Sequence, residues 1–138
     1  MEFWDIYDIN KRPTGRTMKR NDWCLKDGEY HLTVLGVVAR PDGTFLITKR
    51  VLTKAWAPGW WEVSGGAAQA GEESRDAVLR EVKEETGLYV RPESICELGE
   101  IIELHRDIFE PDKKFICHSL FFYCDVLDRQ APLSLTPS

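Results

Sequence analysis

Three glutamates lie close together in the segment REVKEETG, residues 80–87. Glu81, Glu84 and Glu85 stand at positions i, i+3 and i+4, which places them on one side of an α-helix. Like charges at this spacing cost a helix only about 0.2–0.5 kcal/mol, so their repulsion does not exclude a helix here. One interpretation is a solvated charged face that neighbouring basic residues balance. The other is a cluster of carboxylates that binds a divalent cation.

A glycine-rich segment, SGGAAQAGEES, comes directly before these residues. Gly66 and Gly71 match the first part of a phosphate-binding P-loop. Glu72 and Glu73 then stand where a P-loop requires Lys and Ser or Thr, so the loop brings no cation of its own. Oxygen-rich clusters select hard divalent cations. We therefore predict a site for Mg²⁺ or Mn²⁺ whose open positions bind phosphate oxygens.

The helix that carries the glutamates is predicted to begin after Gly71, with Ser74 as its N-cap, and to stop at Gly87. A wheel of about 100° per residue gathers the side chains that face the sheet into one arc, namely Val78, Leu79, Val82 and Thr86. The carboxylates border this arc. We therefore expect them at the margin of the core and not on the fully solvated side.

The rest of the chain has mostly the composition of strands. We expect strands over residues 2–10, 29–40, 44–50, 60–64, 94–104 and 114–127. Turn residues at 41–44 predict a hairpin over 30–50. The basic segment 11–20, which contains Pro13 and Gly15, is predicted to be a loop. Because strands outnumber the single helix in the middle of the chain, the pattern predicts an α+β fold with a mixed sheet.

Length and charge limit the class of protein. A chain of 138 residues predicts one domain, and the net charge of −5 argues against a protein that binds nucleic acid polymers through phosphate contacts. The start of the chain lacks a signal-peptide pattern, and no apolar run reaches the ~18 residues of a membrane span. We expect a cytoplasmic protein with no membrane contact. No zinc-ligand spacing is present, so buried structural thiols are predicted for Cys24, Cys96, Cys117 and Cys124.

The segment Gly66–Leu88 resembles the Nudix box, G-x5-E-x7-R-E-U-x-E-E-x-G-U, where U is a bulky aliphatic residue. The nine specified positions are all filled, by Gly66, Glu72, Arg80, Glu81, Val82, Glu84, Glu85, Gly87 and Leu88. So complete a match within 23 residues is highly specific. The resemblance implies a single Nudix domain over residues 1–138. Its fold would be an α/β/α sandwich on a mixed sheet, with the box as a loop–helix–loop.

The resemblance also implies a metal-dependent hydrolase that cleaves the diphosphate of a nucleoside diphosphate linked to another group. Arg80 would orient a glutamate of the box by ion pairing, and Glu81 would be either a metal ligand or the general base. By position, the metal site would comprise Gly65, Glu72, Glu81, Glu84 and Glu85, with the carbonyl of Gly65 as a ligand and Glu72 in support. Some family members take the base or a further ligand from outside the box, for which the candidates are Glu100, Glu103 and Glu110.

Substrate contacts are predicted on the strand and loop that lead to the box. Lys49 and Arg50 end a strand and are predicted to bind phosphate. Trp56 is predicted to stack on a flat group, with Trp60 as an alternative, whereas Trp61 is expected in the core. The basic segment either forms a solvated surface or guides phosphates, through Lys11, Arg12, Arg16, Lys19 and Arg20. The expected partner is a small diphosphate, and a homodimer is left open.

Residues 3–90 resemble a Nudix subgroup that includes isopentenyl-diphosphate isomerases. Those isomerases require a cysteine where this chain has PGWWEVSGG, and they usually carry an incomplete box. Both differences favour a hydrolase, with an isomerase-like enzyme or a non-catalytic nucleotide-binding domain as alternatives. His31 matches a metal-binding histidine of that subgroup, and we expect it to have a hydrogen-bonded structural role. Only 50 residues follow Leu88, so we expect a domain that is short at its C-terminus, or one that a partner subunit completes.

Overall fold

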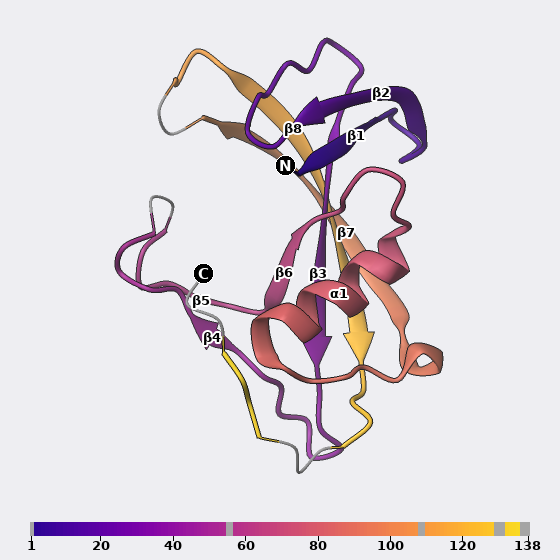
Figure 1. Cartoon of the computed structure of the whole chain (residues 1–138), viewed down its shortest axis with the longest axis vertical. Coiled ribbons are helices and arrows are strands. Elements are labelled where there is room, and N and C mark those ends of the chain that lie inside the picture. The colour runs from indigo at the N-terminus through magenta and orange to yellow at the C-terminus, as the bar shows by residue number, and fades with distance from the viewer. Residues whose placement is uncertain (1, 55–56, 108–109, 129–131, 136–138) are drawn as a thin grey trace.

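A mixed sheet forms the centre of the molecule (Figure 1). The computed structural model describes residues 2–54, 57–107, 110–128 and 132–135. The sheet has four strands in the order β6-β3-β8-β7, with bounds Ser64–Ala67, His31–Val38, Lys114–Cys124 and Cys96–Arg106. β3 runs parallel to β8, whereas β6 and β7 pair antiparallel with their neighbours. The predicted mixed sheet is confirmed, as is the inner position of β3.

A smaller sheet pairs β1 (Phe3–Tyr7) with β2 (Pro13–Lys19). The prediction of a loop over residues 11–20 is therefore wrong for most of that segment. Trp4 of β1 pairs with Met18, and the two side chains share a small cluster of buried residues. Met18 is the only buried residue of β2. Because every other side chain of β2 is exposed, the apolar alternation that marks a strand is missing from its sequence.

The predicted hairpin over residues 30–50 forms only at its turn. Ala39 pairs with Phe45 across that turn. The chain then leaves the sheet, and β4 (Thr48–Lys49) pairs with β5 (Trp61–Glu62) instead. The physical reason is that both edges of β3 are already occupied, one by β6 and the other by β8. Along residues 33–36, β3 therefore has no edge left for a third partner, and the returning chain reaches it only where the N–H of Leu46 donates to the carbonyl of Val38.

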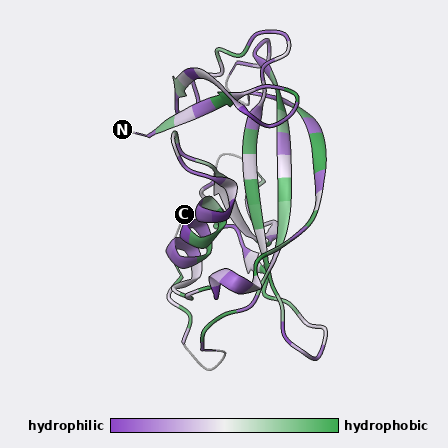
Figure 2. Cartoon of the chain, turned by 90° about the vertical axis from the view of Figure 1, so that its right-hand side faces the viewer, coloured by the Kyte–Doolittle hydropathy of each residue, from purple (hydrophilic) through white to green (hydrophobic). Residues whose placement is uncertain are grey.

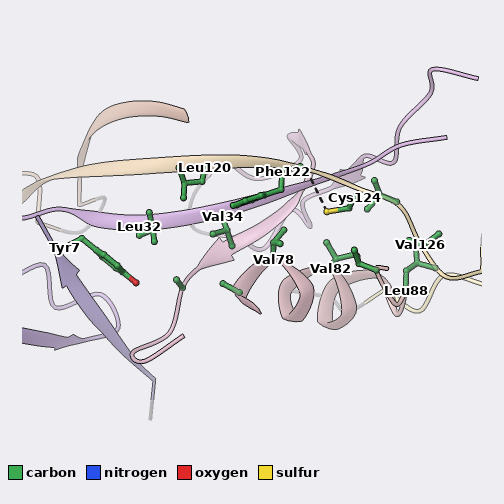
Figure 3. Packing of buried hydrophobic residues seen from close by; sticks show 14 residues of the cluster. Tyr7, Leu32, Val34, Val78, Val82, Leu88, Leu120, Phe122, Cys124 and Val126 are labelled. Carbon is green, nitrogen blue, oxygen red and sulfur yellow. Dashed lines mark hydrogen bonds between the residues drawn. The ribbon is translucent and has the colours of Figure 1, made fainter. Parts of the chain in front are cut away.

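The α-helix α1 (Ser74–Thr86) packs against the sheet, as predicted (Figure 3). Its N-cap is Glu73 and not Ser74, because Glu73 has an extended backbone while Ser74 is already helical. Gly36 of β3 lets the helix approach closely, since a Cβ there would lie 2.8 Å from Cγ2 of Val82. Buried apolar side chains of the helix and the sheet form the main core, among them Val34, Val78, Val82, Leu120, Phe122 and Cys124.

The helix covers one face of the central sheet (Figure 2). Within the residues that the structure describes, α1 is the only α-helix, and the one other helical segment is the single 3₁₀ turn Pro92–Ser94. The described part of the chain is therefore an α+β fold of two layers, without the second helical layer of the expected α/β/α sandwich. No described helix has both the length and the apolar composition that a membrane crossing requires.

The cysteines divide into two classes. Cys117 and Cys124 are buried free thiols, as predicted, and burial raises the pKa of Cys124 to about 11. The same prediction is wrong for Cys24 and Cys96, which are exposed. Cys96 opens the edge strand β7, most of whose side chains are exposed, and Cys24 lies in the connection that leads to β3. Apolar composition around a cysteine therefore did not decide its burial.

His31 is buried at the start of β3, in contact with the rings of Trp4 and Trp23, which also contact each other. Burial lowers its pKa to about 3, so the imidazole is neutral at physiological pH. The hydrogen bond expected for it is not found at Nδ1, which has no partner among the described residues. Aromatic packing is therefore what defines its structural role. His118 is also buried, and its Nδ1 lies 3.4 Å from Glu100.

Gly87 ends the helix with a left-handed φ of 76°, as predicted. A second constraint acts at the same residue, because the C-terminal segment crosses the end of the helix there. The backbone N–H of Ser134 donates a hydrogen bond of 2.7 Å to the carbonyl of Thr86. A Cβ on Gly87 would lie 2.7 Å from the Cβ of Ser134. Gly87 therefore permits both the turn and the close approach of this segment.

Gly87→Ala is predicted to lower the free energy of unfolding by more than Gly71→Ala does. Both glycines have positive φ, of 76° and 80°, so each substitution forces alanine into a left-handed conformation that costs about 1–2 kcal/mol. Only Gly87 also meets Ser134, because nothing lies within 4 Å of a Cβ at Gly71. Urea denaturation of the two variants measures the difference. Equal losses would show that the C-terminal segment does not press on the end of the helix.

Candidate catalytic site

Arg80 connects the helix, the loop before it and the strand β6. Its Nε and Nη2 donate hydrogen bonds of 2.8 and 2.9 Å to the two carboxylate oxygens of Glu72. Its Nη1 donates to Glu81 at 2.8 Å and to Glu84 at 3.2 Å, and Nη2 also donates to the carbonyl of Ala67 at 3.1 Å. The two bonds to Glu72 form a bidentate pair, the strongest geometry available to arginine. Arg80 therefore orients glutamates of the box by ion pairing.

Glu72 stabilises the glycine-rich loop through the same carboxylate. The backbone N–H of Gln69 donates to Glu72 at 3.0 Å. Burial opposes the ionisation of Glu72, but the hydrogen bonds from Arg80 and Gln69 outweigh it and hold its pKa below the ordinary value. Both of its oxygens already accept hydrogen bonds from Arg80. This arrangement holds Arg80 and the loop in place, which suits the supporting role that the resemblance implied for Glu72.

Glu81 lies half-buried against the strand β6. A Cβ on Gly66 would come within 2.6 Å of its Oε1, so only glycine at that position leaves room for the carboxylate. Burial raises the pKa of Glu81, and the hydrogen bond from Arg80 offsets part of that effect. The nearby charges of Glu84 and Glu2 raise it further. Glu81 is therefore held in one place but is only partly neutralised.

Glu85 is the second half-buried carboxylate, and it accepts a hydrogen bond of 3.3 Å from the backbone N–H of Gly65. Burial raises its pKa to about 7, and the charges of Glu81 and Glu62 act in the same direction. Two adjacent carboxylates that lose water and repel each other have the donor chemistry of a hard divalent cation site. The residues present therefore fit Mg²⁺ or Mn²⁺.

The glutamates of the box do not surround a common point in the described structure. Among the described residues, no three His, Cys, Asp or Glu side chains stand close enough to hold a metal ion. On the helix, Glu84 accounts for this lack of a cluster, because its side chain is 57% exposed and is paired with Arg80. An exposed ion pair of this kind contributes only about 0–1 kcal/mol. Glu84 can therefore leave Arg80 and turn towards Glu85 at little cost.

A cavity of about 310 Å³ adjoins Glu85. Lys49, Arg50 and Trp61 line it, so both predicted phosphate contacts lie beside a predicted metal ligand. Arg50 is paired with Glu62 at 3.2 Å, and the Nζ of Lys49 lies 5.8 Å from the centre of the Trp61 ring. The expectation that Trp61 is a core residue is wrong, because it is 63% exposed. β5 has only two residues and covers no part of the core, so it leaves this indole at the cavity.

Two other tryptophans, Trp56 and Trp60, precede Trp61 in the sequence and were the ones predicted to stack on a flat group. Trp56 lies outside the residues that the structure describes. Trp60 is 66% exposed, on the segment that leads into β5. It is not among the residues that line the cavity. Of the three neighbouring tryptophans, Trp61 is therefore the one that the described structure brings to the cavity.

The acidic candidates outside the box lie elsewhere. Glu100 and Glu103 are on β7, which β3 and β8 separate from β6, the strand that contacts the box glutamates. Glu100 pairs with Lys11, and Glu103 lies 3.5 Å from both Ser119 and His105. Glu110 is in the connection between β7 and β8 and pairs with Lys113. The described fold therefore does not bring these three carboxylates to the helix.

The basic segment of residues 11–20 is largely neutralised by acidic neighbours. Lys11 pairs with Glu100 and Arg16 with Glu29, and Arg20 pairs with Glu2. None of these residues lines the cavity beside Glu85. Of the two interpretations of this segment, the arrangement favours the solvated surface.

Two carboxylates near the site were missed from the sequence. Glu62 of β5 lines the cavity, and its charge acts on Glu85. Glu2 acts on Glu81 from the start of the chain. The sequence contained one signal for Glu62, which lies three residues before the Gly65-Gly66 pair. Glu2 had none, because only the packing of β1 beside the loop before the helix brings it there.

A family model of the NUDIX domain matches residues 29–135. The chain belongs to the Nudix family. The match includes the box, the strands that position it and the described residues that line the cavity beside Glu85. The resemblance inferred from the nine positions of the box is thereby confirmed.

Curated relatives agree with this assignment. An uncharacterized Nudix hydrolase of Listeria monocytogenes is 38% identical over 91 residues, which are 65% of this chain and 53% of that protein. A second, from Clostridium acetobutylicum, is 36% identical over 121 residues, 85% of this chain and 57% of that protein. An isopentenyl-diphosphate Delta-isomerase of Kocuria rhizophila is 33% identical over 87 residues, 62% of this chain and 48% of that protein. The Nudix chain thus spans about half the length of these relatives.

Solved structures share the fold. A crystal structure from Deinococcus radiodurans matches with a TM-score of 0.70 and 19% identity, and covers 99% of this chain and 77% of that one. A MutT/nudix family protein from Enterococcus faecalis matches with a TM-score of 0.61 and 23% identity, over 80% of this chain and 41% of that one. The α+β Nudix fold is therefore shared even where the sequences have diverged.

Arg80→Lys is predicted to lower the free energy of unfolding by about 1–3 kcal/mol, because lysine keeps the charge but cannot form the paired bonds to Glu72. Arg75→Lys is the matched control on the same helix, since Arg75 is exposed and donates only to the carbonyl of Pro92 in the described structure. We expect that variant to stay within about 0.5 kcal/mol of the parent. Thermal unfolding followed by circular dichroism measures both. Similar losses for the two variants would contradict the role given to Arg80.

Proposed function

We propose that this Nudix chain hydrolyses the diphosphate linkage of a nucleoside diphosphate that carries another group. The observation that carries the proposal is the position of the box. Of its two half-buried carboxylates, Glu85 lines a cavity that Lys49 and Arg50 also line, and the charge of Glu81 acts on Glu85. Acidic groups able to bind a cation and basic groups able to bind phosphate therefore stand on one concave surface. Diphosphate chemistry requires that combination.

Mg²⁺ or Mn²⁺ would be held by Glu81, Glu84 and Glu85 with the carbonyl of Gly65, and it would neutralise phosphate charge and lower the pKa of the attacking water. The chain's own residues prepare this site. Arg80 and Glu72 hold Glu81 in position, and the glycine at residue 66 leaves room for its carboxylate.

Glu81 serves either as a ligand or as the general base that accepts a proton from water. The second role gains support from burial, which raises its pKa towards the operating pH and so makes it a better proton acceptor. On the substrate side, Lys49 and Arg50 bind oxygens of the diphosphate. Arg50 is kept beside the cavity by Glu62 at 3.2 Å, so it is oriented before substrate binds.

The hydrolase is preferred over an isomerase-like enzyme for a reason within the site. The segment PGWWEVSGG, which forms β5 and the start of β6, contains no cysteine, although the isomerases need one there. The partial match to an isomerase keeps that alternative testable. Incubation with isopentenyl diphosphate and Mg²⁺ distinguishes the two activities, because a hydrolase produces no allylic isomer.

Glu85→Gln and Glu81→Gln are each predicted to lower kcat by about 10²-fold or more, because each removes a charge that holds the cation or accepts the proton. Glu73→Gln is the matched control, since Glu73 is an exposed glutamate next to the same helix. Phosphate release is measured against nucleoside triphosphates, dinucleoside polyphosphates, NADH, nucleotide sugars and coenzyme A. Full turnover by the Glu85→Gln variant would exclude the assigned role. If the parent chain binds nucleotides but neither it nor any variant hydrolyses them, the result would instead support a non-catalytic domain.

Removal of divalent cations is predicted to abolish hydrolysis, and Mg²⁺ or Mn²⁺ should restore it. Because the cation binds the folded chain, it should also raise the melting temperature of the parent chain, and do so less in Glu85→Gln. Isothermal titration calorimetry with Mg²⁺ alone measures the binding separately from turnover. Undiminished activity in EDTA, together with no heat of Mg²⁺ binding, would contradict a metal site at the box.

A further inference from the structure

Two chemically different sets of residues line the cavity beside Glu85. One set is polar or charged and consists of Thr48, Lys49, Arg50, Glu62 and Glu85. The other set is apolar and consists of Leu46, Ile47, Val51, Trp61, Leu133 and Leu135. The charged residues suit the diphosphate of the function proposed above. The apolar residues have no part in that chemistry and need an explanation of their own.

The apolar lining is accessible to solvent in the structure. Ile47 is 45% exposed and Trp61 63%, while Leu133 and Leu135 are 48% and 57% exposed. Single exposed apolar side chains are normal on a protein surface. Several that converge on one concave surface next to catalytic groups indicate a binding site instead. Water against these four side chains would be displaced favourably by an apolar group.

Two of these side chains come from the C-terminal segment, which is tied to the catalytic helix. The residue between them, Ser134, donates its backbone N–H to the carbonyl of Thr86, next to Glu85. Gly87 provides the room for that contact. Leu133 and Leu135 line the cavity and therefore keep a defined position relative to the box. Their segment passes the C-terminal end of α1 (Figure 1).

The size of the cavity limits what fits. Its volume of about 310 Å³ corresponds to roughly ten water molecules. A single ring system or a short chain fills that space. A sugar or a charged group would exchange its water for apolar side chains without replacement hydrogen bonds, at a cost in free energy. The indole of Trp61 offers a flat apolar face, and the Nζ of Lys49 lies 5.8 Å from the centre of its ring.

We propose that this cavity binds the group attached to the diphosphate, that this group is apolar, and that Leu133, Leu135 and Trp61 determine the preference for it. The proposal rests on the proposed function for the position of the diphosphate beside Lys49 and Arg50. The apolar class includes both a flat aromatic ring and an aliphatic chain. Both place an apolar group against the same side chains.

Equilibrium binding tests this proposal without depending on turnover. The probes are diphosphate esters of equal charge with a methylene bridge that resists hydrolysis, bearing a methyl group, a phenyl ring or a short aliphatic chain. Titration calorimetry with the complete 138-residue chain and Mg²⁺ measures each affinity. We expect the ring or the chain to bind about tenfold or more tightly than the methyl ester. The better of the two identifies which apolar group the cavity prefers.

Variants then test which side chains are responsible. Leu133→Ser and Leu135→Ser should each remove most of that preference and leave binding of the methyl ester within about twofold. Leu98→Ser is the matched control, because Leu98 is 59% exposed on β7 and does not line the cavity. Trp61→Ala is a further variant that does not rely on the C-terminal segment. Circular dichroism confirms that each variant is folded.

The outcomes separate this proposal from the function on which it rests. Equal affinities for all three esters, or a preference that survives both leucine variants and Trp61→Ala, would overturn the apolar subsite. Tight, variant-sensitive binding of an apolar ester without hydrolysis of any diphosphate would support the subsite and reject the hydrolase. Hydrolysis that is indifferent to the attached group, with unchanged rates in the variants, would support the hydrolase and reject the subsite.

Discussion

The guanidinium of Arg80 is the interaction on which the candidate site depends. It joins Glu72 in the loop, Glu81 in the helix and the carbonyl of Ala67 in β6, so one side chain connects the three segments of the box. Arginine can do this because its planar group donates five hydrogen bonds in fixed directions. Lysine would supply the charge without the directions. The geometry of the carboxylates therefore follows from one residue that need not touch substrate.

Close packing between the helix and the sheet is the second constraint. Gly36 lets Val82 rest on β3, and Gly66 leaves space for the carboxylate of Glu81 against β6. Neither glycine has a left-handed backbone, so their role is room and not conformational freedom. A larger side chain at residue 36 would push the helix away from β3, and one at residue 66 would displace the carboxylate of Glu81. The glutamates are half-buried because the helix lies this close.

That proximity creates the electrostatic character of the site. Glu81 and Glu85 are partly withdrawn from water and repel each other, and burial is the main cause of the raised pKa of each. Arg80 relieves Glu81, but among the described residues Glu85 accepts a hydrogen bond only from the backbone N–H of Gly65. A site whose negative charge is incompletely balanced favours the binding of cations. The same constraint that holds the fold together therefore produces the carboxylate environment of the metal site that we propose.

The sequence by itself determined the elements whose signals are local. The spacing of Glu81, Glu84 and Glu85 predicted the helix and its acidic side, and Gly87 predicted its end, because helix periodicity and capping depend only on near neighbours. The β-branched residues of 31–38 predicted the inner strand in the same way. Local signals failed for β2, which takes its hydrogen bonds from β1 and buries only Met18.

Tertiary structure alone decided what surrounds the box. Trp61 was expected in the core and lies at the cavity, while Glu100 and Glu103 lie on β7 with two strands between them and β6. Leu133 and Leu135 reach the cavity because a backbone hydrogen bond ties Ser134 to the end of the helix. These contacts join residues far apart in the chain, and no periodicity records such a pairing. The family and the proposed chemistry were thus visible in the sequence, whereas the shape of the cavity required the fold.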